Sequence, residues 1–246
     1  MNYALILSGG RGTRLGSDTP KQYLKVQNKM IISYCLDTIF ASSYIDRVQI
    51  VAEEEWRDTI LDYIKENRQL ERFAGFSAPG ENRQLSIFHG LQDILSSRSG
   101  ISDTKDNVMI HDAARPSMDE TTISAGFHAL KDHDGAMPVL PMKDTVYLTE
   151  NGKISSLLDR SHVVAGQAPE FFRFESYFAA NQALLPEKIK GINGSTEPAV
   201  LAGLDVAVID GDEKNFKITT KADLDRFESL MNKLSGLRDS NRKDTD

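Results

Sequence analysis

The stretch Tyr3-Ala-Leu-Ile-Leu-Ser-Gly-Gly-Arg-Gly-Thr-Arg-Leu-Gly16 decides how this chain folds. Its first five residues, Tyr3 to Leu7, are continuously apolar, which is typical of a strand buried on both faces of a sheet. Four glycines follow, so the backbone can come close to a ligand and point its N–H groups inward. Arg11, Arg14 and Lys21 add positive charge to the same connection. The pattern predicts a polyphosphate-binding loop, with a glycine-rich turn carrying solvated cations as the alternative. Neither the Walker pattern nor the three-glycine dinucleotide pattern fits it.

The rest of the chain alternates short apolar runs with longer amphipathic stretches. This rhythm predicts an α/β fold, in which a mostly parallel sheet is covered by helices on both faces to give three layers. The further predicted strands are Arg47–Ala52, Asn107–Ile110, Gly135–Leu140 and Asp205–Ile209, and the predicted helices are Ile31–Phe40, Glu54–Glu66, Leu85–Leu95, Thr121–Lys131, Phe174–Leu184 and Ala222–Leu234.

Residues 141–172 interrupt the rhythm. Thr145–Thr149 and Lys153–Leu157 are strand-like and flank Glu150-Asn151-Gly152, and Asn-Gly between such runs indicates a β-hairpin. We expect this hairpin to leave the body as an arm that pairs with a second subunit. The prediction is one domain over residues 1–236, followed by a frayed polar tail over 237–246.

The composition of the chain limits which partners, metals and cellular compartments are expected for it. Its 246 residues include 29 basic and 36 acidic ones, and the net charge of −7 argues against a nucleic-acid partner. The single Cys35 cannot form an internal disulfide, and the five histidines have no zinc spacing. No apolar run is long enough to span a membrane, and the start does not resemble a signal peptide. A cytoplasmic protein is expected.

An acidic residue ends another predicted strand. In Val108-Met-Ile-His-Asp112, the carboxylate comes at the carboxyl edge of the sheet, where open α/β sheets bind ligands. Asp112 can therefore hold a Mg²⁺ ion that bridges nucleotide phosphates. The alternative is an N-cap for the following turn.

These motifs together resemble one family. The chain contains motifs similar to those of the 2-C-methyl-D-erythritol 4-phosphate and ribitol-5-phosphate cytidylyltransferases. They are Gly9-Gly-x-Gly-Thr-Arg-Leu-Gly16 with Pro20-Lys-Gln-Tyr23, Gly80-Glu-Asn-Arg-x-x-Ser86 and His111-Asp-Ala-Ala-Arg-Pro116. The resemblance runs in order from residue 3 to about residue 230. It implies a Rossmann-like nucleotidyltransferase fold, CTP as substrate, Mg²⁺ as cofactor and a homodimer whose arm carries Arg160 to the other subunit's site.

The resemblance also implies roles for individual residues. Lys21, Arg14 and Lys217 are the expected catalytic residues, and Asp112 is the expected metal ligand. The expected nucleotide-binding residues, with Gly80, Glu81 and Ser86 facing cytosine, are Leu7, Ser8, Gly9, Gly10, Arg11, Gly12, Thr13, Gly80, Glu81, Arg83, Ser86 and Ala113. The expected acceptor-binding residues are Asp112, Arg115, Thr145, Arg160, Ala168 and Lys217.

Departures from the family pattern gather at the acceptor end. Ala168 lacks the hydroxyl that a threonine would offer there, Thr196-Glu197-Pro198 replaces a Thr-Asp motif, and Lys214 stands where the methylerythritol branch often has an aspartate. We expect transfer of CMP from CTP to a small polyol phosphate resembling ribitol 5-phosphate. The alternatives are methylerythritol phosphate as acceptor, a nucleotidyltransferase using UTP or dTTP with a sugar 1-phosphate, and a non-catalytic nucleotide-binding subunit. The sequence leaves open whether the product enters isoprenoid or cell-envelope synthesis.

Overall fold

The computed structural model describes residues 1–10, 18–98 and 105–243, with side chains described as far as Ser235. Its main sheet runs in the order β10-β7-β11-β6-β1-β4-β5, with β12 also paired to β7. The pairs β1–β4, β1–β6, β4–β5 and β7–β12 are parallel, whereas β10 and β11 are antiparallel to their neighbours. These strands are β1 (Asn2–Leu7), β4 (Arg47–Val51), β5 (Phe73–Ser77), β6 (Asn107–Asp112), β7 (Gly135–Pro141), β10 (Val164–Gly166), β11 (Glu170–Arg173) and β12 (Val206–Asp210).

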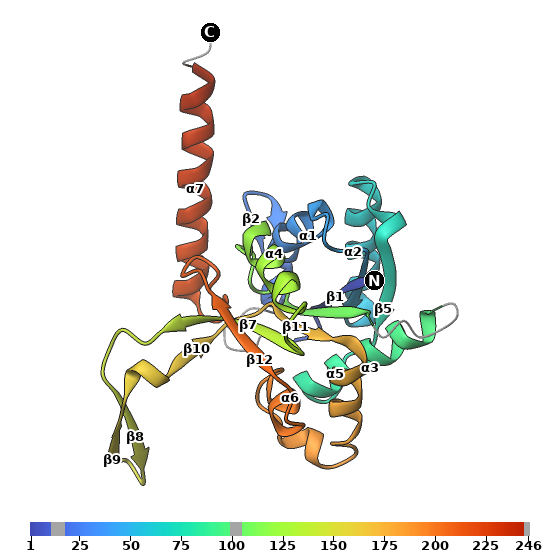
Figure 1. Ribbon diagram of the computed structural model, residues 1–246. Helices are drawn as coiled ribbons and strands as arrows, with labels where there is room; N and C mark the ends of the chain where they lie inside the picture. The colour runs from blue at the N-terminus through green and yellow to red at the C-terminus, as the bar shows by residue number, and fades with distance from the viewer. Residues whose placement is uncertain (11–17, 99–104, 244–246) are drawn as a thin grey trace.

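Helices cover both faces of this sheet, so the predicted three-layer α/β fold is confirmed (Figure 1). The α-helices are α1 (Ile31–Ala41), α2 (Glu54–Glu66), α3 (Arg83–Ser97), α4 (Glu120–Ala129), α5 (Phe174–Gln182), α6 (Glu197–Leu201) and α7 (Lys221–Lys243). Short 3-10 helices occupy Lys21–Tyr23, Leu70–Arg72, Arg160–His162 and Lys188–Gly191, and two small hairpins are formed by β2 (Lys25–Val26) with β3 (Lys29–Met30) and by β8 (Val146–Glu150) with β9 (Lys153–Leu158).

The side chains of each strand point alternately to the two faces of the sheet, which explains why helices cover both faces. In β1, Ala4 and Ile6 belong to the core beneath α1, α2 and α4, while Tyr3 and Leu5 belong to the core beneath α3 and α5. Because successive strand side chains point to opposite faces, a continuously apolar strand is buried on both. The first strand of the chain is therefore the centre of the molecule. In the part of the chain that the structure describes, no helix has the length and apolarity needed to span a membrane.

Three strands of the main sheet were not predicted. β5 contains Gly75 at φ +140° and a register shift against β4, so it lacks a regular strand pattern. β10 and β11 are only three and four residues long and are separated by Gln167-Ala-Pro169. Because both strands pair within the main sheet, the expected arm limits of 141–172 extend too far.

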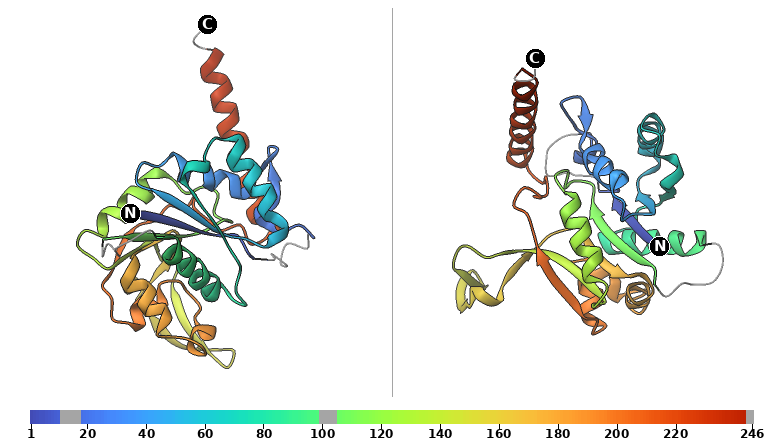
Figure 2. Two further views of the ribbon diagram at one scale, coloured as in Figure 1. Left: turned by 90° about the vertical axis from the view of Figure 1, so that its right-hand side faces the viewer. Right: turned by 45° about the horizontal axis from the view of Figure 1, so that its top comes forward.

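The arm is the hairpin β8–β9 together with its connections, and it projects from the body in Figure 1 and in the right-hand view of Figure 2. The apolar side chains of Tyr147, Leu148, Ile154 and Leu157 are exposed on it. An isolated two-stranded hairpin is marginally stable in water, so burial of these side chains against another surface would stabilise the arm.

Helix α7 also projects from the body and continues to Lys243 (Figure 1). The expected polar tail over residues 237–246 therefore includes helical backbone as far as Lys243. This segment contains neither proline nor glycine, so a helical backbone can continue through polar sequence.

Candidate active site

A cavity of about 620 Å³ opens at the carboxyl ends of β1 and β6. Leu7 and Asp112, the last residues of these two parallel strands, are register partners, and the N–H of Ala113 donates to the carbonyl of Leu7 at 3.1 Å. The sheet therefore brings the glycine loop and the acidic strand end together, as predicted. The cavity is lined by Leu7, Gly9, Gly10, Lys21, Gln22, Glu53, Gly80, Glu81, Asn82, Arg83, Ser86, Asp112, Ala114, Lys217 and Thr219.

Close backbone approach explains two of the glycines. A Cβ atom on Gly9 would lie 2.5 Å from Cγ of Pro79, and one on Gly80 would lie 2.4 Å from Cβ of Leu85. A larger residue at Gly9 would force the glycine loop away from the segment before α3, and one at Gly80 would force that segment away from the first turn of α3.

The segment from Gly80 to Ser86 is fixed as the start of α3. Asn82 caps this helix by accepting from the Leu85 N–H at 2.8 Å, and the Ser86 hydroxyl accepts from the Gly80 N–H at 2.9 Å. The first bond satisfies an N–H group that a helix start would otherwise leave without a partner, and the second ties Gly80 to the first turn of α3. Gly80, Glu81 and Ser86 are consequently held together on the cavity wall.

Gln22 ties the glycine loop to the residues that follow it. Its side-chain amide donates to the carbonyls of Ser8 at 2.7 Å and Gly10 at 2.8 Å, and the Ser8 hydroxyl donates to that of Tyr23 at 2.8 Å. Lys21, the neighbour of Gln22, lines the cavity from the short helix Lys21–Tyr23. A buried polar anchor thus fixes the position from which Lys21 reaches the cavity.

Three cations surround Asp112. Its Oδ2 lies 2.9 Å from Nζ of Lys217 and 3.6 Å from Nε of Arg115, and its Oδ1 lies 3.1 Å from Nη2 of Arg83. Burial alone would raise the pKa of this carboxyl, but Arg83 and Lys217 outweigh burial and hold the pKa well below its usual range. Asp112 is therefore ionised, and the surplus positive charge favours an anionic ligand.

Arg83 joins this cluster to a second buried carboxyl group. Its Nη1 donates to the Ser195 hydroxyl at 2.7 Å, and that hydroxyl donates to Oε1 of Glu170 at 2.5 Å. Burial raises the pKa of Glu170 to about 7, an effect that Arg83 opposes and Asp112 reinforces. The site therefore contains two carboxyl groups in different electrostatic environments.

The other predicted site residues lie outside the cavity wall or outside the described residues. Ser8 and Ala113 are buried beside the cavity, and Ala168 is buried with its carbonyl accepting from Asn215 at 2.8 Å. Arg115 forms an ion pair with Asp112 and donates to the carbonyl of Asn215. Four residues of the glycine loop, Arg11, Gly12, Thr13 and Arg14, lie outside the described residues.

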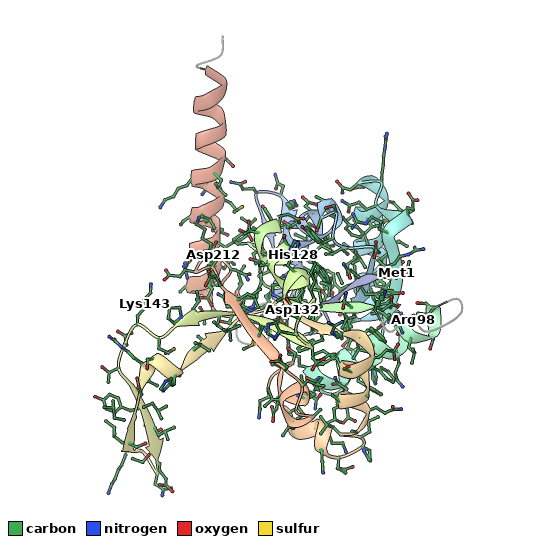
Figure 3. All side chains as sticks on the ribbon, in the orientation of Figure 1. Met1, Arg98, His128, Asp132, Lys143 and Asp212 are labelled. Atoms are coloured by element: carbon green, nitrogen blue, oxygen red, sulfur yellow. The ribbon has the colours of Figure 1, made fainter. Side chains whose placement is uncertain are left out.

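Thr145 and Arg160 belong to the arm region, separate from this cavity. Arg160 donates to the carbonyl of Lys143 at 2.6 Å, and Lys143, which pairs with Glu213, lies where the arm leaves the body (Figure 3). The structure thus does not bring Arg160 and Lys21 together within one chain.

Several residues of the site were not among those predicted. Gln22 and Thr219 stand beside predicted residues in the same motifs, so proximity in sequence could have found them. Glu53 was interpreted as part of a solvated helix start, but it also lines the cavity. Ser195 and Glu170 contact Arg83 from distant parts of the chain, and no sequence signal pairs them with it.

The donor set is compatible with a magnesium ion only in part. Within the described residues, no three side chains of His, Cys, Asp or Glu gather as a metal site. Asp112 offers an ionised carboxylate on the cavity wall, which the carboxylate residues Glu53 and Glu81 also line. Mg²⁺ is commonly bound by one or two carboxylates together with substrate phosphates and water. Asp112 therefore fits as a single protein ligand to a phosphate-bound ion.

One cavity at the edge of a mostly parallel sheet is lined by a glycine loop, two lysines and a strand-end carboxylate. This is the arrangement of a nucleotidyltransferase. The family model for 2-C-methyl-D-erythritol 4-phosphate cytidylyltransferase (IspD) matches residues 3–233, and the chain belongs to this family.

Individual relatives agree with this assignment. A bifunctional enzyme IspD/IspF of Paramagnetospirillum magneticum is 33% identical over 231 residues, covering 92% of this chain and 56% of that protein. The chain thus spans little more than half the length of this bifunctional relative. A ribitol-5-phosphate cytidylyltransferase of Streptococcus agalactiae is 30% identical over 237 residues, covering 94% of this chain and 95% of that protein. The crystal structure of 4-diphosphocytidyl-2C-methyl-D-erythritol synthase from Anaerococcus prevotii shares the fold, with a TM-score of 0.79, 22% identity and coverage of 94% and 96% of the two chains.

Proposed function

We propose that this protein transfers CMP from CTP to a small polyol phosphate resembling ribitol 5-phosphate and releases pyrophosphate. The observation that carries the proposal is the single cavity shared by Gly9, Gly10, Lys21, Asp112 and Lys217. This cavity offers backbone N–H groups and cations for a triphosphate on one side and a charged cluster for a second phosphate on the other.

The reaction needs no covalent enzyme intermediate. An oxygen of the acceptor phosphate attacks the α-phosphorus of CTP in line, the bond to the bridging oxygen breaks, and pyrophosphate leaves. Positioning and charge neutralisation supply most of the catalysis in reactions of this kind. Lys21 is assigned to the triphosphate, and Lys217 to the acceptor phosphate beside the α-phosphoryl group. Arg14 is assigned to the triphosphate as well, on the motif resemblance alone.

Asp112 is the residue that would hold Mg²⁺. When bound, the ion would offset negative charge on the phosphates. Lys217 and Arg115 keep the Asp112 carboxylate oriented toward the cavity through their contacts with Oδ2.

The acceptor end supports a polyol phosphate on charge grounds. Lys217 lines the cavity beside Asp112, so recognition would depend more on the phosphate than on the carbon skeleton. The methylerythritol phosphate named in the family description is the alternative acceptor. A sugar 1-phosphate with UTP or dTTP, and a non-catalytic nucleotide-binding role, are the remaining alternatives.

A homodimer is part of this proposal. Its support is the exposed apolar surface of the arm and the position of Arg160 outside the described lining of its own chain's cavity. Together these favour an arm that completes a second subunit's site. A cytoplasmic location is also proposed, on the basis that Cys35 is a free, buried thiol compatible with a reducing compartment.

Pyrophosphate release tests the proposal. The assay combines each of CTP, UTP and dTTP with ribitol 5-phosphate, methylerythritol 4-phosphate or a sugar 1-phosphate, with and without Mg²⁺. We expect release with CTP and ribitol 5-phosphate above all other combinations. Turnover of methylerythritol phosphate alone would replace the acceptor, and nucleotide binding without turnover would favour the non-catalytic role.

A further inference from the structure

Arg83 is held on three sides at the wall of the cavity. Its Nε and Nη2 each lie 3.1 Å from Oδ1 of Asp112, and its Nη1 donates to the Ser195 hydroxyl at 2.7 Å. On the third side, Oε2 of Glu170 lies 3.9 Å from Nη2. Asp112 ends β6, Glu170 begins β11, and Ser195 lies in the loop before α6. Three separate segments therefore converge on one guanidinium group.

Glu170 acts on this group both directly and through Ser195. A serine hydroxyl carries one proton, and here that proton is donated to Oε1 of Glu170. The Ser195 oxygen must therefore present a lone pair to Nη1 of Arg83. Oε2 of Glu170 is buried, has no hydrogen-bond partner within the described residues, and lies beside the guanidinium. Each carboxyl oxygen of Glu170 thus acts on Arg83, Oε1 through the Ser195 hydroxyl and Oε2 directly.

We propose that Glu170 is a positioning residue, which with Ser195 fixes the guanidinium of Arg83 for nucleotide binding. This inference rests on the proposed function. Arg83 is the first residue of α3, directly after the Gly80, Glu81 and Asn82 segment of the cavity wall, so its position bears on the nucleotide part of the site.

Asp112 alone cannot supply this constraint. Its two oxygens are already shared among Arg83, Lys217 and Arg115, and it is also the residue available to a metal ion. A carboxylate that gains a further cation binds each of its partners less strongly. Arg83 is 31% exposed and has a long side chain, so a weakened contact to Asp112 would let it move. Glu170 and Ser195 hold the guanidinium independently of Asp112.

The test compares CTP binding by calorimetry, and kinetic constants from pyrophosphate release, at about pH 8. Glu170→Gln keeps an oxygen for Ser195 but removes the charge, and we expect CTP to bind about 5- to 20-fold more weakly with kcat changed less than about threefold. Ser195→Ala should weaken CTP binding by a smaller factor. Arg83→Lys should weaken it at least as much as Glu170→Gln, because lysine lacks the guanidinium fork.

A double variant separates positioning from a general loss of structure. If Glu170 acts through Arg83, Arg83→Lys combined with Glu170→Gln should bind CTP no more weakly than Arg83→Lys alone. The matched control is Asn181→Ala, which alters the same buried network through Gln84 and Tyr177 but does not contact Arg83. It should lower the melting temperature and leave CTP affinity within about twofold.

Two results would overturn the inference. One is CTP affinity in Glu170→Gln within about twofold of the wild type, and the other is an effect that multiplies with that of Arg83→Lys. A wild-type protein that prefers another nucleoside triphosphate would contradict the proposed function instead, and the same variants would then be compared with that nucleotide.

Discussion

Lys21 is positioned by its neighbours before any substrate arrives. It lies on the cavity wall, and the adjacent Gln22 is bound to the two carbonyls at the start of the glycine loop. A preorganised charge at a reacting centre costs no reorganisation during the reaction, and its removal typically lowers the rate by ~10²–10³, or roughly 3–4 kcal/mol. We expect Lys21→Ala to lower kcat by this factor, measured as pyrophosphate release at saturating CTP.

The control for this variant is Lys25→Ala, an exposed lysine four residues further along the chain. Its rate should equal that of the wild type. A Lys21→Ala protein that keeps its circular dichroism spectrum and more than about a tenth of the rate would show that Lys21 does not stabilise the transition state.

Glu170 gives the stability of the protein a defined pH dependence. Burial raises the pKa of its carboxyl to about 7, whereas a glutamate in an unfolded chain titrates near ~4.3. Between these values the folded protein retains a proton that the unfolded chain has lost. The contribution of Glu170 to the free energy of unfolding is therefore fully present below the unfolded value and is lost as the pH rises through about 7.

Glu170→Gln should remove this dependence. We expect the unfolding free energy of the wild type to fall relative to the variant by about 2–3 kcal/mol between about pH 5 and pH 8, measured by urea unfolding at each pH. Exposed Glu66→Gln is the control and should leave the pH dependence unchanged. Parallel curves for the wild type and Glu170→Gln would show that Glu170 titrates alike in the folded and unfolded chains.

Among the elements, α4 packs on the sheet through a glycine. A Cβ atom on Gly126 would lie 2.2–2.3 Å from ring atoms of Phe171, which is fully buried on β11. A buried aromatic ring in a close-packed core cannot shift at low cost. We expect Gly126→Ala to lower the free energy of unfolding by about 1–3 kcal/mol, although alanine favours helix. Gly194→Ala, where a Cβ would meet open space, should change it by less than about 0.5 kcal/mol. Equal stability of the two variants would contradict this account of the contact.

How far the sequence predicted these elements depended on pattern length. β1 is a continuous apolar run and the longer helices carry a sustained period, so they were predicted. The five-residue helix α6 was not predicted, nor were β5, β10 and β11, which are short or interrupted by Gly75 and Pro169. The residues of the site divide in a similar way, into those that belong to a sequence motif and those that only the fold brings together. Motif residues such as Lys21, Gly80 and Asp112 were found because their neighbours in sequence define them. The contacts among Arg83, Glu170 and Ser195 join distant segments, and only the folded sheet brings these residues together.

At the level of the whole molecule, Arg160 follows the arm hairpin and is not among the described residues that line the cavity of its own chain. Arg160 donates to the backbone at the base of the arm, while Lys21 lies at the carboxyl edge of the sheet. The arm projects from the body (Figure 2, right). Its apolar side chains Tyr147, Leu148, Ile154 and Leu157 are exposed. In a symmetric dimer each arm would meet the other subunit, and each site would combine Lys21 of one subunit with Arg160 of its partner. Such an assembly makes two inactive variants complementary.

We expect Lys21→Ala and Arg160→Ala to be inactive alone and to regain activity when their subunits are mixed and exchanged. A heterodimer would contain one site with both lesions and one site with neither, so random exchange should restore about a quarter of the wild-type rate. The control mixes Lys21→Ala with itself under the same exchange conditions, and labelled subunits verify that exchange takes place. If Arg160 instead acted within its own chain, every site in the heterodimer would carry one lesion. Demonstrated exchange with no recovery of pyrophosphate release would therefore place Arg160 outside the partner's site.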